Sequence, residues 1–151
     1  MSAKEYEEYE QACAAIREEN AKLLSAFRQW LGQSGISEKT IDRHASNADF
    51  YINEFLLYED AVPAEDGADQ ISMFLGYWFI RKAMWASTSA IKQNAVSLAK
   101  FYAFMLEKGL IDSEDLQHLE RTIKNRMPEW LATMKRYDDP DITDPDEIWG
   151  L

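Results

Sequence analysis

Apolar residues recur along this chain mainly at intervals of three and four, the period of an α-helix, and no run alternates as strands do. The clearest stretch runs from Ser87 to Ile111. Ser87 or Thr88 can cap the start of a helix there, and Gly109 can end it. The expected apolar face consists of Ile91, Ala95, Leu98, Tyr102 and Met105. The expected polar face carries Gln93, Ser97, Lys100 and Glu107, with Lys92 at its flank and Phe104 projecting from it.

Residues 4–31 predict one long helix, or two abutting helices, ended by the stretch from Gln33 to Gly35. A seam with heptad spacing follows its length: Tyr6, Tyr9, Cys13, Ile16, Asn20, Leu23, Phe27 and Trp30. Asn20 is the polar member of this seam, a position where Asn can fix the register of paired helices. Two interpretations stay open. The seam forms a homodimer or binds another protein, or it packs along its own domain.

The other periodic stretches predict shorter helices. One begins at Ser37 and buries Ile41, Ala45, Ala48, Ile52, Phe55 and Leu56, with His44 as a partly buried neutral imidazole at its edge. A second spans Gln70 to Met84, is capped by Asp69, and is apolar enough all round to be central. Ser113 is expected to cap a third helix ending near Asn125, and Pro128 to open a last one, Glu129 to Arg136. The predicted fold is an all-α, compact bundle of four to six helices.

Charge divides the chain into three parts. Residues 1–20, an expected N-terminal helical extension, hold six acidic and two basic residues, and residues 137–151, an expected flexible tail, hold six acidic and none basic. The helical domain between them, residues 21–136, accounts for little of the net charge of −11, and residues 70–136 carry ten basic against six acidic residues. The acidity argues against a general DNA-binding protein but leaves room for a local basic face.

Other features of the sequence limit the possible chemistry. The single cysteine, Cys13, cannot form an internal disulfide or a multi-cysteine metal site, and no second His or Cys lies at metal-ligand spacing from His44, so no metal or cofactor is expected. A Gly-rich phosphate loop and a Gly-x-Ser-x-Gly elbow are both missing from the sequence. The longest apolar block, Ile71 to Ile80, is half a membrane span. We therefore expect a cytoplasmic protein that is not an enzyme and has no membrane partner.

The stretch from Phe27 to Leu56 resembles the opening of the core-binding domain of tyrosine recombinases, the phage-integrase family. The residues that carry the resemblance are Phe27, Leu31, Gly35, Ser37, Thr40, Ile41 and Phe55, followed by Ile71, Phe74, Leu75, Thr88, Leu98, Phe101, Tyr102, Phe104 and Gly109 to Ile111. It covers roughly residues 21–111. The resemblance implies a SAM-like helical bundle that packs against double-stranded DNA, as in DNA integration and recombination. The DNA-binding residues that it implies by position are Lys39, Thr40, Arg43, Ser87, Thr88, Lys92 and Gln93.

The chain departs from that family in having only forty residues after Ile111, which leaves no room for a catalytic domain. His118 and Arg121 do spell the family's His-x-x-Arg and Tyr137 follows, but we interpret this match as coincidental. The prediction is a non-catalytic DNA-binding module. The alternative is a protein-interaction module that uses the N-terminal seam, the acidic tail and the exposed aromatic residues Phe104, Tyr77 and Trp85. In a third interpretation the acidic tail covers the basic face and inhibits it.

Overall fold

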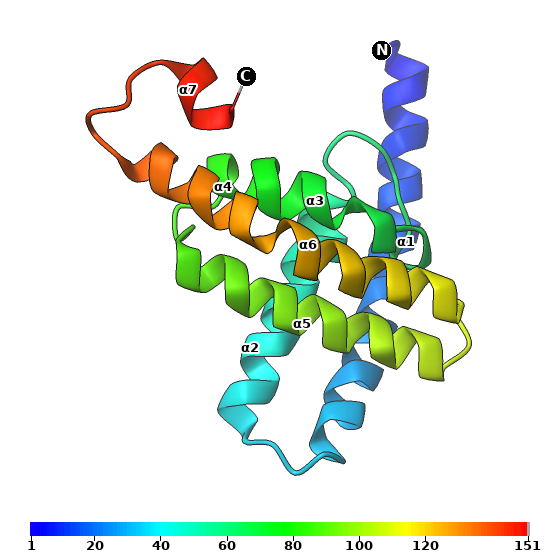
Figure 1. The fold of residues 1–151 in the computed structure, drawn as a ribbon. Helices are drawn as coiled ribbons and strands as arrows, with labels where there is room; N and C mark the ends of the chain where they lie inside the picture. Colours follow the sequence, from blue (N-terminus) through cyan, green and yellow to red (C-terminus); the bar gives the residue numbers. More distant parts are fainter. Residues whose placement is uncertain (151) are drawn as a thin grey trace.

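A computed structural model describes residues 1–150 of the chain, and within this range it contains helices and loops but no strand (Figure 1). The all-α bundle expected from the sequence is confirmed. The α-helices are α1 (Ala3–Gly32), α2 (Glu38–Asp49), α3 (Ile71–Met73), α4 (Phe79–Lys82), α5 (Thr88–Glu107), α6 (Ser113–Asp138) and α7 (Pro145–Trp149). Two π-helical segments, η1 (Phe50–Phe55) and η4 (Phe74–Trp78), continue α2 and α3, and two 3₁₀ turns, η2 (Ala64–Asp66) and η3 (Ala68–Gln70), precede α3.

The helices form two crossed layers around one core. α1 and α2 make a hairpin that lies behind α5, and α6 runs alongside α5 in the opposite direction (Figure 1). Ser37 caps α2 and Ser87 caps α5, each accepting a hydrogen bond from a backbone N–H in the first turn, as the sequence predicts. Gly109 follows α5 with φ of 73°, the left-handed conformation that glycine adopts without a side-chain penalty.

Aromatic side chains fill the space where α1 meets α5. The Phe27 ring lies edge-on to Phe101 at 5.3 Å and 5.6 Å from Phe104, between ring centroids. Phe104 is 1% exposed, so its predicted position on the polar side of α5 is wrong. The sequence pattern predicted one buried face for this helix. In the structure α5 is covered on two sides, by α1 and α2 on one and by α6 on the other, so residues outside the predicted face are buried too.

Buried polar side chains anchor the irregular segments to the helices. The Tyr51 hydroxyl donates to Gly67 O at 2.6 Å, and the Tyr102 hydroxyl donates to Ala64 O at 2.8 Å. Burial raises the pKa of both phenols well above the usual value, so both remain neutral donors. These two bonds give partners to the buried carbonyls of Ala64 and Gly67 and so hold the segment before α3 against the core.

The N-terminal seam packs largely within its own domain. α1 is one continuous helix across residue 20, and Cys13, Asn20 and Phe27 are buried. Asn20 donates to Ile52 O at 3.2 Å and to Asn53 Oδ1 at 2.8 Å, so this polar seam residue fixes the register between α1 and η1. Tyr6, at the start of the seam, is exposed.

Two predicted boundaries at the C-terminal side are wrong. α6 is one 26-residue helix with Pro128 inside it, and Asp112 forms its capping box, where the sequence predicted two helices and a Ser113 cap. The helix continues past Pro128 because Trp130 and Met134 beyond it, like Leu119 before it, are buried in the common core. Asp69 does not cap the third helix either, since α3 begins after Gln70 without a side-chain cap.

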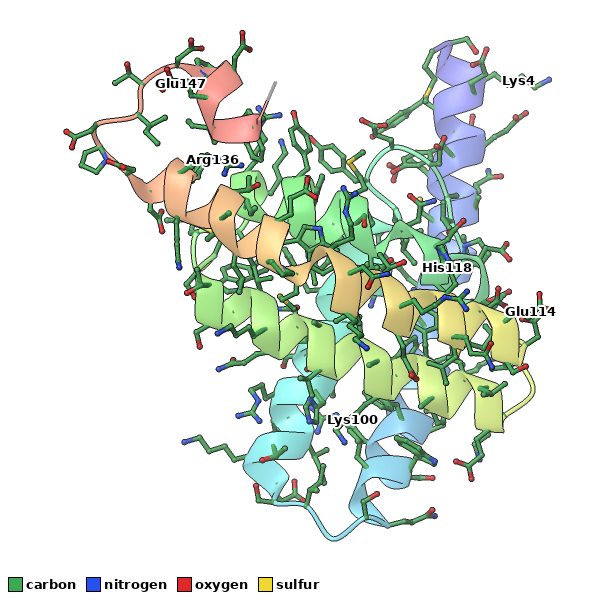
Figure 2. All side chains as sticks on the ribbon, in the orientation of Figure 1. Lys4, Lys100, Glu114, His118, Arg136 and Glu147 are labelled. Carbon is green, nitrogen blue, oxygen red and sulfur yellow. The ribbon has the colours of Figure 1, made fainter. Side chains whose placement is uncertain are left out.

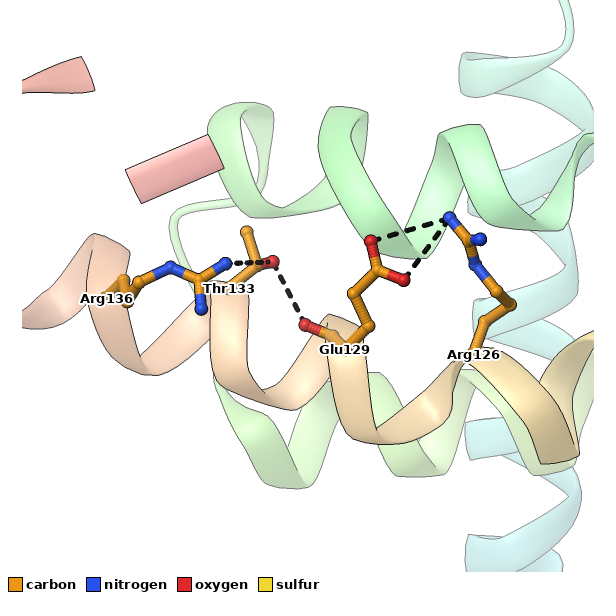
Figure 3. Close-up of polar contacts among 4 residues, drawn as sticks. All are labelled: Arg126, Glu129, Thr133 and Arg136. Carbon is orange, nitrogen blue, oxygen red and sulfur yellow. Dashed lines mark hydrogen bonds and ion pairs between the residues drawn. The ribbon is translucent and has the colours of Figure 1, made fainter. Parts of the chain in front are cut away.

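The acidic C-terminal segment turns back onto α6. The Trp149 ring centroid lies 4.7 Å from that of Tyr77 and 6.0 Å from that of Tyr137. Arg136 Nε donates to Ile148 O at 2.9 Å, while Arg136 Nη2 donates to Thr133 Oγ1 at 3.0 Å, one link in the polar chain along α6 shown in Figure 3. No helix within residues 1–150 has both the length and the apolar composition to cross a membrane.

Close contact between η4 and α6 leads to a first prediction, the effect of Gly76→Ala. A Cβ at Gly76 would lie 2.9 Å from both Cδ1 and Nε1 of Trp130, whose ring is buried and cannot move aside freely. We expect a loss of about 1–3 kcal/mol in the free energy of unfolding, measured by urea denaturation. The matched control is Gly32→Ala, where no atom lies within 4 Å of the added Cβ, and equal stability of the two variants would contradict the prediction.

Candidate nucleic-acid interface

The residues expected to bind DNA on α2 lie in its first two turns. Lys39 and Arg43 are exposed and stand one helical turn apart on the same side of α2. Thr40 is partly covered, and its hydroxyl accepts a hydrogen bond from Ser37 Oγ at 3.0 Å. Lys39 and Arg43 can therefore reach a ligand directly, whereas Thr40 supports the cap of α2.

The residues expected on α5 lie at its N-terminal end. Ser87 Oγ accepts from the Ala90 N–H at 3.0 Å, so this hydroxyl serves the helix cap, and Thr88 is partly covered. Lys92 and Gln93 are exposed, and Gln93 Nε2 lies 3.4 Å from Ser89 Oγ, to which it donates. Lys92 and Gln93 are thus the two residues of this group whose side chains extend into solvent.

The two predicted groups do not converge on one point. Trp85, two residues before the α5 cap, packs on Phe50 at the C-terminal end of α2, with 5.0 Å between ring centroids. α2 has 12 residues, about 18 Å at 1.5 Å per residue, so Ser87 and Thr88 lie roughly that far from Lys39. The N-terminal ends of α2 and α5 therefore lie at the two ends of an elongated strip of the protein surface.

Where α5 crosses α2, a buried polar cluster joins the two helices. Ser97 Oγ lies 2.7 Å from His44 Nδ1 and accepts from Asn47 Nδ2 at 3.0 Å. Ser97 is fully buried, so its predicted place on the polar face of α5 is wrong, because α2 covers that position. The cluster fixes how α2 sits on α5 and hence how the cations of the two helices are spaced.

A further cation, Lys100, lies near His44, and the resemblance did not include it among the DNA-binding residues. Burial lowers the pKa of the His44 imidazole, and the positive charges of Arg43 and Lys100 lower it further. Arg43 and Lys100 therefore both lie within electrostatic range of His44, from α2 and from α5 respectively, and Figure 2 labels Lys100. The sequence does contain a signal for it: Lys100 follows Lys92 by eight residues, slightly more than two helical turns. We call Lys39, Arg43, Lys92 and Lys100 the α2/α5 basic face.

None of the four cations of the α2/α5 basic face forms an ion pair within residues 1–150. Within residues 1–150 the ion pairs are Lys22–Glu19, Arg28–Asp42 and Arg126–Glu129. Asp42, the acidic residue next to Arg43, lies 2.7 Å from Arg28 Nη1 on α1, so its charge is matched away from this face. Figure 2 shows Lys100 in the lower half of the view, whereas Lys4 and Glu147, from the two acidic termini, lie at its top.

Two carboxylates, of Asp49 and Glu54, lie near the N-terminal end of α5, at one end of the α2/α5 basic face. A shallow depression of about 300 Å³ beside the α5 cap is lined by Ser46, Asn47, Asp49, Phe50, Glu54 and Trp85. Asp49 and Glu54 bring two carboxylates to this part of the surface and make it less favourable to phosphate.

No known family model matches this chain, and no curated protein sequence or solved structure does either. Within residues 1–150, no three His, Cys, Asp or Glu side chains gather in a way that would hold a metal ion.

The buried state of His44 predicts how stability depends on pH. Because the folded-state pKa lies below the unfolded value of about 6.5, the unfolded chain binds the proton more readily. The free energy of unfolding should therefore fall as pH drops from about 7 through 6.5, by at most about 1.4 kcal/mol per pH unit. His44→Gln should flatten this slope in urea titrations at successive pH values. His118→Gln, at an exposed position on α6, is the control, and loss of the slope in that variant would contradict the assignment.

Proposed function

We propose that the protein is a non-catalytic module that binds double-stranded DNA through the α2/α5 basic face, in the manner that its resemblance to the core-binding domain of tyrosine recombinases implies. The observation that carries this proposal is the set of four exposed cations without carboxylate partners on two crossing helices. A SAM-like arrangement, a role in DNA integration or recombination and a cytoplasmic location belong to the same proposal.

The spacing of the cations favours a nucleic-acid backbone over a single phosphate group. Lys39 and Arg43 are separated by about 6 Å along α2, and Lys92 and Lys100 by about 12 Å along α5, at 1.5 Å per residue. Such a strip can contact several successive phosphates and release their counterions, which is the main source of sequence-independent affinity for DNA. Gln93, exposed on α5, supplies an amide group of the kind that hydrogen-bonds to phosphates or base edges.

The net charge of −11 is compatible with this proposal because the acidic ends lie elsewhere. α7 packs against α6 and Tyr77, and the N-terminal part of α1 projects on the same side of the molecule as α7, away from the α2/α5 basic face (Figure 1). At physiological ionic strength the Debye length is about 8 Å, so distant carboxylates weaken phosphate binding much less than adjacent ones would. The contribution of the tail to DNA affinity is therefore expected to be small.

The direct test replaces Lys39, Arg43 and Lys92 together by Glu and titrates fluorescent duplex DNA at low and moderate salt. The unmodified chain should bind with an affinity that falls as salt rises, and the triple variant should lose detectable binding, because charge reversal places carboxylates beside the phosphates. The control variant reverses Arg121, Lys124 and Lys135, exposed residues of α6, and so has the same net charge. Equal loss in both variants, or no binding by the unmodified chain at low salt, would refute the proposal.

Lys100→Ala tests the cation that the resemblance did not assign. If Lys100 neutralises one phosphate, the slope of log affinity against log salt should become shallower by about 0.9. The same titration across several salt concentrations measures this slope. An unchanged slope would place Lys100 outside the interface while leaving Lys39, Arg43 and Lys92 within it.

A further inference from the structure

A groove lined mainly by aromatic and apolar residues lies beside the third helical segment. It has a volume of about 410 Å³ and is lined by Phe55, Leu56, Tyr58, Glu59, Asp60, Val62, Gln70, Met73, Tyr77 and Trp78. Three of its large side chains are well exposed: Tyr58 at 51%, Met73 at 54% and Tyr77 at 40%. We call this feature the aromatic groove. Clustered exposed aromatic and methionine side chains of this kind mark interaction surfaces in soluble proteins.

Both acidic ends of the chain adjoin the aromatic groove. On one side the Tyr9 hydroxyl of α1 donates to Leu57 O, next to the groove residue Tyr58. On the other side Trp149 of α7 lies 4.7 Å from Tyr77, between ring centroids. The N-terminal part of α1 and the α7 segment lie on the same side of the bundle (Figure 1), and Figure 2 labels Lys4 and Glu147 there. Folding thus places two acidic segments that are far apart in the sequence on two sides of the same groove.

Acidic residues predominate in the two chain ends that adjoin the aromatic groove. Residues 1–20 and 137–151 together carry twelve acidic and two basic residues, and Glu59 and Asp60 belong to the groove lining itself. Neither Glu59 nor Asp60 forms an ion pair within residues 1–150. Their charges are therefore available to a ligand.

The two cations nearest the groove are engaged with its tyrosines. Arg81 Nη1 donates to the Tyr77 hydroxyl at 2.6 Å, and its guanidinium lies 5.2 Å from the centroid of that ring. Lys82 Nζ donates to the Tyr58 hydroxyl at 3.0 Å and lies 5.0 Å from its ring centroid. These contacts fix the orientation of both exposed rings, which lowers the entropy cost of binding a partner against them.

We propose that the aromatic groove binds a basic amphipathic helix of another protein. The aromatic and methionine side chains would receive the apolar face of that helix, as in other helix-in-groove interactions. The acidic ends and the Glu59–Asp60 pair would attract its basic face and select against acidic partners. A second copy of this chain, with net charge −11 and the same acidic ends, is repelled by these charges, and so is a nucleic-acid backbone.

The test uses a fluorescein-labelled synthetic peptide with leucine and tryptophan on one helical face and lysine on the other. Its binding to the full chain is measured by fluorescence anisotropy beside a peptide of the same composition, scrambled to remove the apolar face. Met73→Ser with Tyr58→Ser should weaken binding of the amphipathic peptide at least about tenfold, because both side chains form the exposed apolar surface. Val96→Ser with Leu110→Ser, which removes two exposed apolar side chains outside the groove, should leave the affinity unchanged.

Three results would overturn this proposal. The first is the absence of binding by the amphipathic peptide, and the second is equal binding of the scrambled peptide or of the Met73/Tyr58 variant, which would indicate charge attraction alone. The third is dimerisation of the unmodified chain in sedimentation equilibrium that the Met73/Tyr58 variant abolishes, which would assign the groove to a second copy. The triple variant of Lys39, Arg43 and Lys92 should keep its peptide affinity, so the result is independent of DNA binding.

Discussion

The packing of α5 against three other helices is the constraint on which the rest of this structure depends. Phe101 and Phe104 meet Phe27 of α1, Ser97 meets His44 of α2, and α6 lies along the other side. Little of α5 remains exposed except a strip that includes Lys92, Val96 and Lys100. The position of that strip determines where positive charge reaches the surface, so the candidate DNA interface is a direct result of core packing.

Hydrogen bonds from buried polar side chains give this packing a defined register. His44, Asn20, Tyr51 and Tyr102 each bond across two segments that are distant in the sequence. Apolar side chains tolerate small sliding movements of one helix on another, whereas an unsatisfied buried polar group costs about 1–3 kcal/mol. These bonds therefore set the spacing between the cations of α2 and α5, and they hold the loop that borders the aromatic groove.

Separation of charge is the second consequence of the fold. Lys100 of the α2/α5 basic face lies in the lower half of the view in Figure 2, whereas the two acidic termini, marked by Lys4 and Glu147, lie at its top and adjoin the aromatic groove. A single chain with net charge −11 can in this way present surfaces suited to oppositely charged partners. The two proposals use different residues, so DNA binding and peptide binding can be disturbed separately.

The sequence by itself determined the local features: the all-α class, the span of α1 and α5, the serine caps of α2 and α5, and the glycine that follows α5. These depend on periodicity and capping within one helix, which neighbouring residues specify. Tertiary structure alone decided that Phe104 and Ser97 are buried, that α6 continues through Pro128, that Lys100 lies near His44 of α2, and that the acidic ends meet the aromatic groove. Each of these depends on a contact between distant segments, and the pattern of a single helix contains no information about which neighbour covers it.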